Sequence, residues 1–196
     1  MTAWDGEVAL RTARLTLRTF TLDDLPAYAG LNADPAVYRW LGGDPLTREH
    51  SDSIAAWAND LWAADRLGLL AVERTEDGRF LGMCGLHHQE SAPDEAAIAW
   101  RLASESWGRG YATEAALAWT AYGFDTLQLP EIISMTDHDN ERSRAVMTRI
   151  GMTYRRDARI VDEGQEFDAV VHSITVDEGR ARTGDGRVVD DGAVGR

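Results

Sequence analysis

The chain has 196 residues and a formal net charge of −13, from 33 acidic residues against 20 basic ones. Hydrophobic residues make up 44% and charged residues 27%, which is typical of one globular domain with a sizeable core. The single cysteine excludes an internal disulfide framework, and the absence of a signal peptide or a membrane-spanning run makes the cytoplasm the expected compartment. The acidic balance argues against nucleic-acid partners, because non-specific binding requires cations to neutralise phosphates, and it weakly favours a cationic substrate such as an amine.

The first half of the chain predicts a strand, two helices and a hairpin. Alternating apolar residues indicate a strand over 14–20, and the capping-box sequence that starts at Thr21 predicts a helix to Leu31. A second helix is expected after Thr47, where large apolar residues recur at helical spacing: Ile54, Trp57, Leu61 and Trp62. Two apolar runs, 69–74 and 80–86, flank Asp77-Gly78 and predict a β-hairpin.

The second half alternates strands with helices. Strands are predicted over 96–102, 131–136 and 170–176, the last closing the sheet, and helices over 112–127 and 140–150. The longer helix has Leu117, Ala121 and Phe124 on one face, and Gly151 is expected to end the other helix in a left-handed conformation. The folded domain is predicted to span residues 8–178. Residues 179–196 contain few bulky apolar side chains and are predicted to form a disordered tail.

The most informative segment is Trp107-Gly108-Arg109-Gly110-Tyr111-Ala112-Thr113, which lies between a predicted strand and a predicted helix. Its two glycines allow the backbone to approach a ligand closely, and the N–H groups of the following helix N-terminus suit a pyrophosphate. The segment is neither a P-loop nor a dinucleotide fingerprint. Taken alone, the segment is better interpreted as a tight turn that merely needs glycine.

A second helix start, Asn140-Glu141-Arg142-Ser143, follows another predicted strand, and its helix ends in Arg149-Ile150-Gly151. Together with residues 10–18 and the hairpin at Asp77-Gly78, this arrangement resembles the GNAT superfamily of N-acetyltransferases, and within it the ribosomal-protein-alanine N-acetyltransferases and their small-amine relatives. The resemblance implies an α+β fold, an α/β/α sandwich. Its central sheet would be mixed and mostly antiparallel, with one splayed pair of parallel strands and helices on both faces.

The resemblance also implies a binding site for acetyl-CoA as co-substrate. The pantetheine arm would lie between the strands over 96–102 and 131–136, bonded to the main chain of Trp100 and Leu102 and to Asn140. The backbone of Gly108, Arg109, Gly110, Tyr111, Ala112 and Thr113 would hold the pyrophosphate, with Arg109 as a charge partner. Ser143 would place a hydroxyl near the thioester sulfur. No metal is expected, because Asp137-His138-Asp139 has no further ligand at suitable spacing.

Three positions depart from the family pattern. Trp107 replaces a Gln or Arg, Ala97 replaces a Glu, and Met147 replaces a Tyr that acts as general acid; a thioether cannot donate a proton. The remaining candidates for proton transfer are Ser143, His87, His88 and Glu95. For the histidines and Glu95, exposed groups without a catalytic role are an equal alternative.

These features predict transfer of an acetyl group from acetyl-CoA to a primary amine, on a small molecule or a protein N-terminus, by direct attack in a ternary complex. The alternatives are a transferase for a longer donor such as succinyl-CoA and a non-catalytic acyl-CoA-binding module. Trp40, Trp57 and Trp62 are candidates for the wall of an acceptor pocket, although two of them also fit a helical core stripe. The edges of such a sheet can pair with a second copy, so a homodimer is compatible with the sequence.

Overall fold

The computed structural model describes residues 3–89, 92–162 and 165–184. In this part of the chain eight strands form one sheet, in the order β1-β2-β3-β4-β5-β6-β8-β7. The strands are β1 (Val8–Arg11), β2 (Leu15–Arg18), β3 (Gly68–Arg74), β4 (Arg79–Gln89), β5 (Ala92–Leu102), β6 (Glu131–Asp137), β7 (Thr153–Asp162) and β8 (Gln165–Thr175). Among these described strands, β5 and β6 are the one neighbouring pair that runs parallel. The predicted fold class, a mixed and mostly antiparallel sheet with helices, is confirmed.

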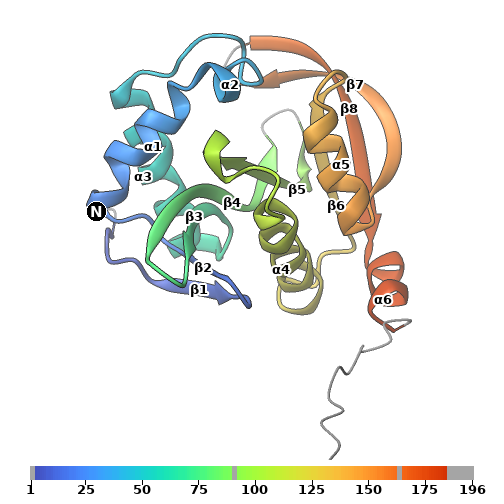
Figure 1. The fold of residues 1–196 in the computed structure, drawn as a ribbon. Helices are drawn as coiled ribbons and strands as arrows, with labels where there is room; N and C mark the ends of the chain where they lie inside the picture. The colour runs from blue at the N-terminus through green and yellow to red at the C-terminus, as the bar shows by residue number, and fades with distance from the viewer. Residues whose placement is uncertain (1–2, 90–91, 163–164, 185–196) are drawn as a thin grey trace, which may run out of the picture.

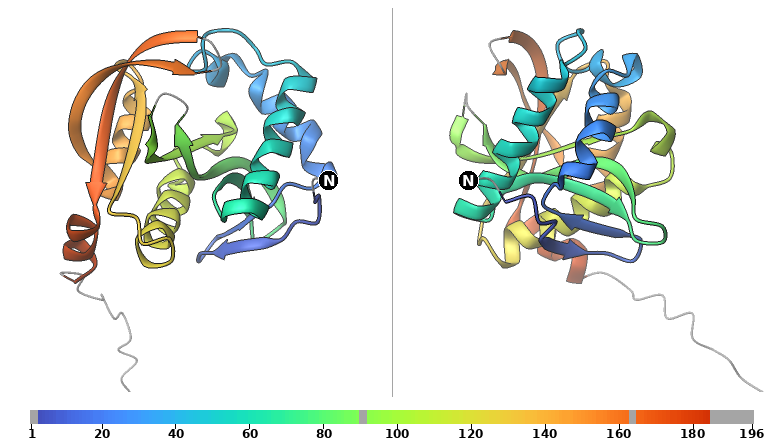
Figure 2. Two further views of the ribbon diagram at one scale, coloured as in Figure 1. Left: turned by 180° about the vertical axis from the view of Figure 1, so that it is seen from behind. Right: turned by 90° about the vertical axis from the view of Figure 1, so that its left-hand side faces the viewer.

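Helices cover both faces of the sheet (Figures 1 and 2). They are η1 (Leu22–Asp24), α1 (Leu25–Asn32), α2 (Pro35–Tyr38), α3 (Arg48–Asp65), η2 (Ser104–Ser106), α4 (Tyr111–Asp125), α5 (Glu141–Ile150) and α6 (Val176–Gly184). Figure 1 places α1 and α3 on one side of the strands and α4 and α5 on the other. None of the described helices is long and apolar enough to cross a membrane.

Strand β3 shows why both faces need a cover. Its side chains alternate between the faces, as strand geometry requires. Leu70 and Val72 pack in the cluster shared with α4 and α5, whereas Leu69 and Ala71 pack in the cluster shared with α1 and α3. A strand that is apolar on both faces is stable only between two layers, so the sequence of β3 itself requires the sandwich.

Two predictions about the sheet were incomplete. Strands β1 and β7 were not predicted, and β8 does not close the sheet, because it lies between β6 and the edge strand β7. The sequence of β7 is rich in charged residues, and its described side chains from Thr153 to Asp157 are exposed. An edge strand with little buried surface lacks the hydrophobic signal from which strands are predicted.

Two predictions about helices were also wrong in part. Leu117 is 47% exposed and Ala121 is exposed, because α4 turns a different face to the sheet. That buried face consists of Ala115, Ala116, Trp119, Thr120, Gly123 and Phe124. At the C-terminus, α6 continues to Gly184, so a tail that begins at residue 179 is too long. The rest of the predicted tail, 185–196, lies outside the described residues.

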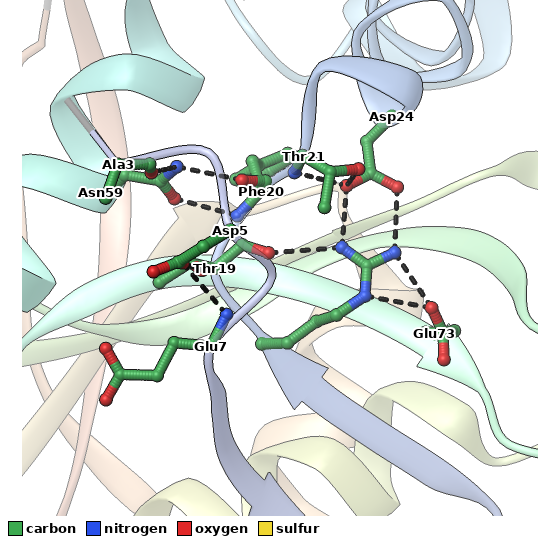
Figure 3. A network of polar contacts seen from close by, with 10 residues as sticks. Ala3, Asp5, Glu7, Thr19, Phe20, Thr21, Asp24, Asn59 and Glu73 are labelled. Carbon is green, nitrogen blue, oxygen red and sulfur yellow. Dashed lines mark hydrogen bonds and ion pairs between the residues drawn. The ribbon is translucent and has the colours of Figure 1, made fainter.

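A polar network ties β2 to its neighbours (Figure 3). The Arg18 guanidinium contacts Asp24 at 2.6 Å and Glu73 of β3 at 2.8 Å, with 11% of the Arg18 side chain exposed. Burial by itself would raise the pKa of Asp24, but hydrogen bonds from Arg18 and Thr21 outweigh it and hold that pKa below its ordinary value. Asp24 also accepts the Thr21 N–H at 2.8 Å, as the predicted capping box requires. The network therefore fixes the chain where it passes from β2 into α1.

Candidate active site

The site begins where β5 and β6 separate. The two strands share a single register pair, Ala97 with Ile133, whereas β4 and β5 pair along most of their length. Beyond Ala97, therefore, β6 no longer supplies partners for the β5 backbone. Backbone groups without a partner in the sheet are available to a ligand. The predicted splayed parallel pair is present at the predicted strands.

A cavity of about 1030 Å³ opens at this separation. Most of the predicted site residues line it: His87, His88, Trp100, Leu102, Gly108, Gly110, Tyr111, Ala112, Thr113, Asn140 and Ser143. Residues that are more than 50 positions apart in the sequence thus meet in one concave space. Arg109 and Glu95 do not line this cavity.

The glycine turn presents the N-terminus of α4 to the cavity. Gly110 is the residue before the helix and has a φ of 80°, a left-handed conformation that favours glycine. The first N–H groups of an α-helix have no partner within the helix, and here they belong to Tyr111, Ala112 and Thr113, which line the cavity. The helix dipole adds a partial positive charge at the same place, so the turn is suited to an anion.

Arg14, the residue before β2, holds this turn in place. Arg14 donates from Nη1 to the carbonyl oxygen of Arg109 at 3.1 Å and forms an ion pair with Glu114 of α4 at 2.6 Å. Burial would raise the pKa of Glu114, but hydrogen bonds from Thr12 and Arg14 outweigh it and hold that pKa below its ordinary value. The Arg109 side chain is exposed, so the expectation that it pairs with a ligand in the cavity finds no support in its position.

Helix α5 forms the opposite wall. Asn140 caps it, because its side-chain oxygen accepts the Ser143 N–H at 3.2 Å. This bond orients the first turn and leaves the amide NH₂ of Asn140 for another acceptor. Met147, one turn beyond Ser143, is fully buried in the main core cluster. The residue at the position of the family's tyrosine therefore packs in the core. On α5, Ser143 is the hydroxyl-bearing residue that lines the cavity.

Trp107 has an unexpected partner. Its indole N–H donates to the carbonyl oxygen of Leu102 at 2.8 Å, which fixes the turn to the end of β5. The Arg142 guanidinium lies over the Trp107 ring, 4.7 Å from the centroid. Both residues line the cavity, one from each wall. An arginine is therefore present beside position 107 after all, supplied by α5 instead of by the turn.

The candidate bases are placed differently from one another. His87 lies opposite Ala97 in the β4–β5 register, and its ring meets the Trp57 ring edge-on, with 6.3 Å between the centroids. Glu95 is bonded to Arg156 of β7 at 2.8 Å, away from the cavity. The structure brings the histidines to the site and places Glu95 in an ion pair between two strands.

The side of the cavity next to α1 and α3 is aromatic. Trp40 and Trp57 line it, whereas Trp62 is 4% exposed and packs in the core. Cys84 is fully buried, and burial raises the pKa of its thiol well above the usual range, so it acts as a core residue and not as a nucleophile.

Three arginines of the cavity were not predicted as site residues: Arg101, Arg142 and Arg149. The signal for Arg142 and Arg149 was their place on the helix that Asn140 starts. Arg101 had no such signal, because its neighbours come from a distant helix. Among the described residues, no group of three or more His, Cys, Asp or Glu side chains could hold a metal ion.

Comparison with known proteins agrees with this geometry. Residues 14–153 match the family model described as an acetyltransferase (GNAT) domain. An acetyltransferase from Agrobacterium tumefaciens is 32% identical, with a TM-score of 0.74 over 89% of this chain and 98% of that one. The FsC-acetyl coenzyme A-N(2)-transacetylase of Aspergillus fumigatus is 29% identical over 76% of this chain and 66% of its own length.

The ribosomal-protein-S5-alanine acetyltransferase of Vibrio fischeri has the same fold at 17% identity, with a TM-score of 0.69 over 87% of this chain and 98% of that one. GNAT enzymes transfer acetyl groups from acyl-CoA donors. The chain is an N-acetyltransferase of the GNAT family.

Proposed function

We propose that this enzyme transfers the acetyl group of acetyl-CoA to a primary amine by direct attack within a ternary complex. The observation that carries the proposal is the meeting of the β5–β6 gap with the N-terminus of α4 in one cavity. The gap offers free backbone groups to an extended arm, and the helix start offers N–H groups to a pyrophosphate. Acetyl-CoA is a thioester that has both an extended pantetheine arm and a pyrophosphate.

The donor would follow the C-terminal half of β5. In this arrangement the backbone of Trp100 bonds the pantetheine arm, together with the amide NH₂ of Asn140. The N–H groups from Gly108 to Thr113 hold the pyrophosphate. Arg142, whose guanidinium lies over the Trp107 ring, pairs with the charge of the pyrophosphate, the role that the sequence analysis gave to Arg109.

The reaction needs an uncharged amine, because an ammonium ion has no free electron pair. The amine nitrogen attacks the thioester carbonyl, the C–S bond breaks, and the products are an N-acetyl amide and the free thiol of CoA. The Ser143 hydroxyl stabilises the departing thiolate and donates its proton to it, and Ser143 is reprotonated from the solvent, to which the base releases the proton taken from the amine. His87 accepts the proton that the amine loses, directly or through one water. Holding the two substrates in line supplies much of the remaining rate.

The acceptor is a small molecule or a protein N-terminus. The Aspergillus relative is named for a transfer from acetyl coenzyme A, which supports the donor. The Vibrio structure is named for the alanine of a ribosomal protein, which supports an amine acceptor, although it shares only the fold with this chain. Succinyl-CoA is a second donor to be compared in the same assay.

The buried Met147 favours one other function, a module that binds acyl-CoA without catalysis, since no acid stands at that position. The two functions are separated by incubating the enzyme with acetyl-CoA and a panel of amines while free thiol is measured. Thiol release that depends on the amine and is accompanied by the acetylated product supports the transferase. Tight binding of acetyl-CoA without turnover on any amine supports the module and contradicts our proposal.

A further inference from the structure

An arginine, Arg101, stands on the aromatic side of the cavity. Arg101 lies on β5 opposite Met83, whose side chain belongs to the cluster that packs against α1 and α3. Since strand side chains alternate, Arg101 points to the same face as Ala99, which packs against that cluster too. The part of the lining that comes from residues 37–57 is mostly apolar and aromatic, with Val37, Trp40, Leu41, Ile54 and Trp57 beside the polar His50 and Ser53.

Within the described part of the chain, the guanidinium of Arg101 has one hydrogen-bond partner, and that partner is neutral. Nη1 donates to the side-chain oxygen of Asn32 at 2.8 Å, and Asn32 in turn donates to Ser51 at 3.0 Å. The Nε atom of Arg101 is buried and has no acceptor among the residues that the structure describes. Among the described residues, no carboxylate forms an ion pair with Arg101. Asp34 instead accepts hydrogen bonds from Ser104 and from the Ala36 N–H.

Such an arrangement is costly without a further partner. An arginine side chain is always charged and carries five N–H donors in a planar fork. A buried N–H without an acceptor, and a charge withdrawn from water without a counter-ion, both destabilise the protein. A carboxylate is the group that fits the fork, because its two oxygens can accept two parallel N–H bonds.

From this we infer that the acetyl acceptor is an amino carboxylic acid, whose carboxylate binds Arg101 and whose apolar skeleton packs against Trp40 and Trp57. The inference rests on the proposed transfer to an amine and names the class of that amine. An amino acid in solution is a zwitterion. Its ammonium group is attracted to a protein with a net charge of −13, and its carboxylate can pair with Arg101. Arg101 then acts as a specificity-determining residue.

Matched pairs of acceptors test the inference, each pair differing only by the carboxylate. Suitable pairs are leucine with 3-methylbutylamine, phenylalanine with 2-phenylethylamine, and 6-aminohexanoate with pentylamine. In the native enzyme we expect kcat/KM to favour at least one acid over its amine by about tenfold or more, the effect of a charge-assisted bond in a partly buried site. Arg101→Gln should abolish that preference by raising KM for the acid. Arg101→Lys should retain part of it.

Two controls separate specificity from folding and from donor binding. Arg79→Gln removes an exposed arginine that pairs with Glu105, and it should leave the preference unchanged. The dissociation constant for acetyl-CoA should stay within about threefold in Arg101→Gln, because a tenfold change would assign the guanidinium to the donor. A purely structural Arg101 would lower kcat/KM for both members of each pair equally.

The inference is overturned if every acid and its amine react equally well, or if a C-terminally amidated alanine peptide is preferred to all the acids. Failure of the proposed function is a different result, namely no turnover with any amine. In that case, calorimetric titration of the CoA-saturated protein with each amino acid decides whether the carboxylate site exists. Binding of an acid that weakens about tenfold or more in Arg101→Gln retains the carboxylate site, and no binding of any acid removes it.

Discussion

Gly110 shows how one residue can serve both the fold and the ligand. Its left-handed φ of 80° lets the chain turn from the loop into α4, and a Cβ at this position would stand 3.5 Å from Nη2 of Arg14, the residue that holds the turn. We expect Gly110→Val to weaken acetyl-CoA binding by more than tenfold, or about 1.4 kcal/mol, because a branched residue is strained at this φ and would displace the N–H groups that face the pyrophosphate. Calorimetry measures the change.

The control for Gly110→Val is Gly78→Val. Gly78 has a φ of 70° and open space around its Cβ position, but it lies in the β3–β4 turn and does not line the cavity. Both variants carry the same kind of backbone strain, so they should lose similar thermal stability. If acetyl-CoA affinity falls equally in both, the loss comes from strain, and the glycine turn is not the pyrophosphate site.

Ser143 tests the proton transfer. Ser143→Ala should lower kcat by about 10–100-fold, which corresponds to one charge-assisted hydrogen bond of about 1.5–3 kcal/mol to the departing thiolate. The dissociation constant of acetyl-CoA should change only a few-fold. Thr148→Ala is the matched control, because its hydroxyl bonds to the Arg144 carbonyl on the exposed side of α5. Equal activity in both variants would leave positioning as the sole source of rate.

The sequence anticipated some residues of the site better than others. Asn140 and Ser143 form a local pattern at a helix start, so they could be placed before the fold was known. Arg101 could not, because its position depends on Asn32, which is 69 residues away. Arg142 was visible as a cation on α5, but its place over Trp107 follows only from the packing of two separate elements.

At the scale of elements, strong periodic signals were reliable and edge or polar segments were not. The two apolar runs and the Asp77-Gly78 turn between them predicted the β3–β4 hairpin, and Gly151 has the expected left-handed conformation, with a φ of 96°. The exposed edge strand β7 gave no burial signal. Helix α4 was predicted at nearly the right bounds but with the wrong face, because small residues such as Ala115 and Gly123 approach the sheet more closely than Leu117 could.

The junction of β2, α1 and β3 depends on a carboxylate that titrates. Asp24→Asn should lower the free energy of unfolding by about 3 kcal/mol at pH 7, because it leaves Arg18 with Glu73 as its only ionic partner in a largely buried position. The pKa of Asp24 is held low in the folded state, so its stabilisation is complete above pH of about 4 and is lost as the pH falls through the folded-state value.

Urea unfolding of the wild type and of Asp24→Asn at a series of pH values measures this effect. The difference between the two proteins should shrink as the pH falls below about 4. Asp23→Asn, which removes the neighbouring exposed carboxylate, should change stability little at any pH. A difference between wild type and Asp24→Asn that is constant with pH would contradict the assigned role of the ion pair.

At the scale of the whole molecule, net charge and site charge have opposite signs. The chain carries −13, yet Arg101, Arg142 and Arg149 line the cavity with Asp137 as its one carboxylate among the described residues. Exposed charges are screened beyond about 8–10 Å at physiological salt, so the distant acidic surface does little to repel an anionic ligand from these arginines. The composition was therefore a poor guide to the ligand, because only the fold determines which charges gather at one place.

The C-terminus gives a test of where the folded unit ends. The Val176 side chain packs against the main core, and Glu178 accepts hydrogen bonds from the N–H and hydroxyl of Thr175 at 2.8 Å. Gly179 lies close against the Phe124 ring: a Cβ on Gly179 would stand 2.6 Å from a ring carbon. Removing residues 176–196 should therefore cost about 2–3 kcal/mol and lower Tm by about 5–10 °C. Removing only 185–196 should leave Tm and acetyl-CoA affinity unchanged, since that segment has few bulky apolar side chains to bury. Calorimetric scans of the two truncated proteins measure these Tm values. Equal Tm values would show that α6 contributes nothing to stability. A lower Tm on removing 185–196 alone would show that this segment packs on the domain.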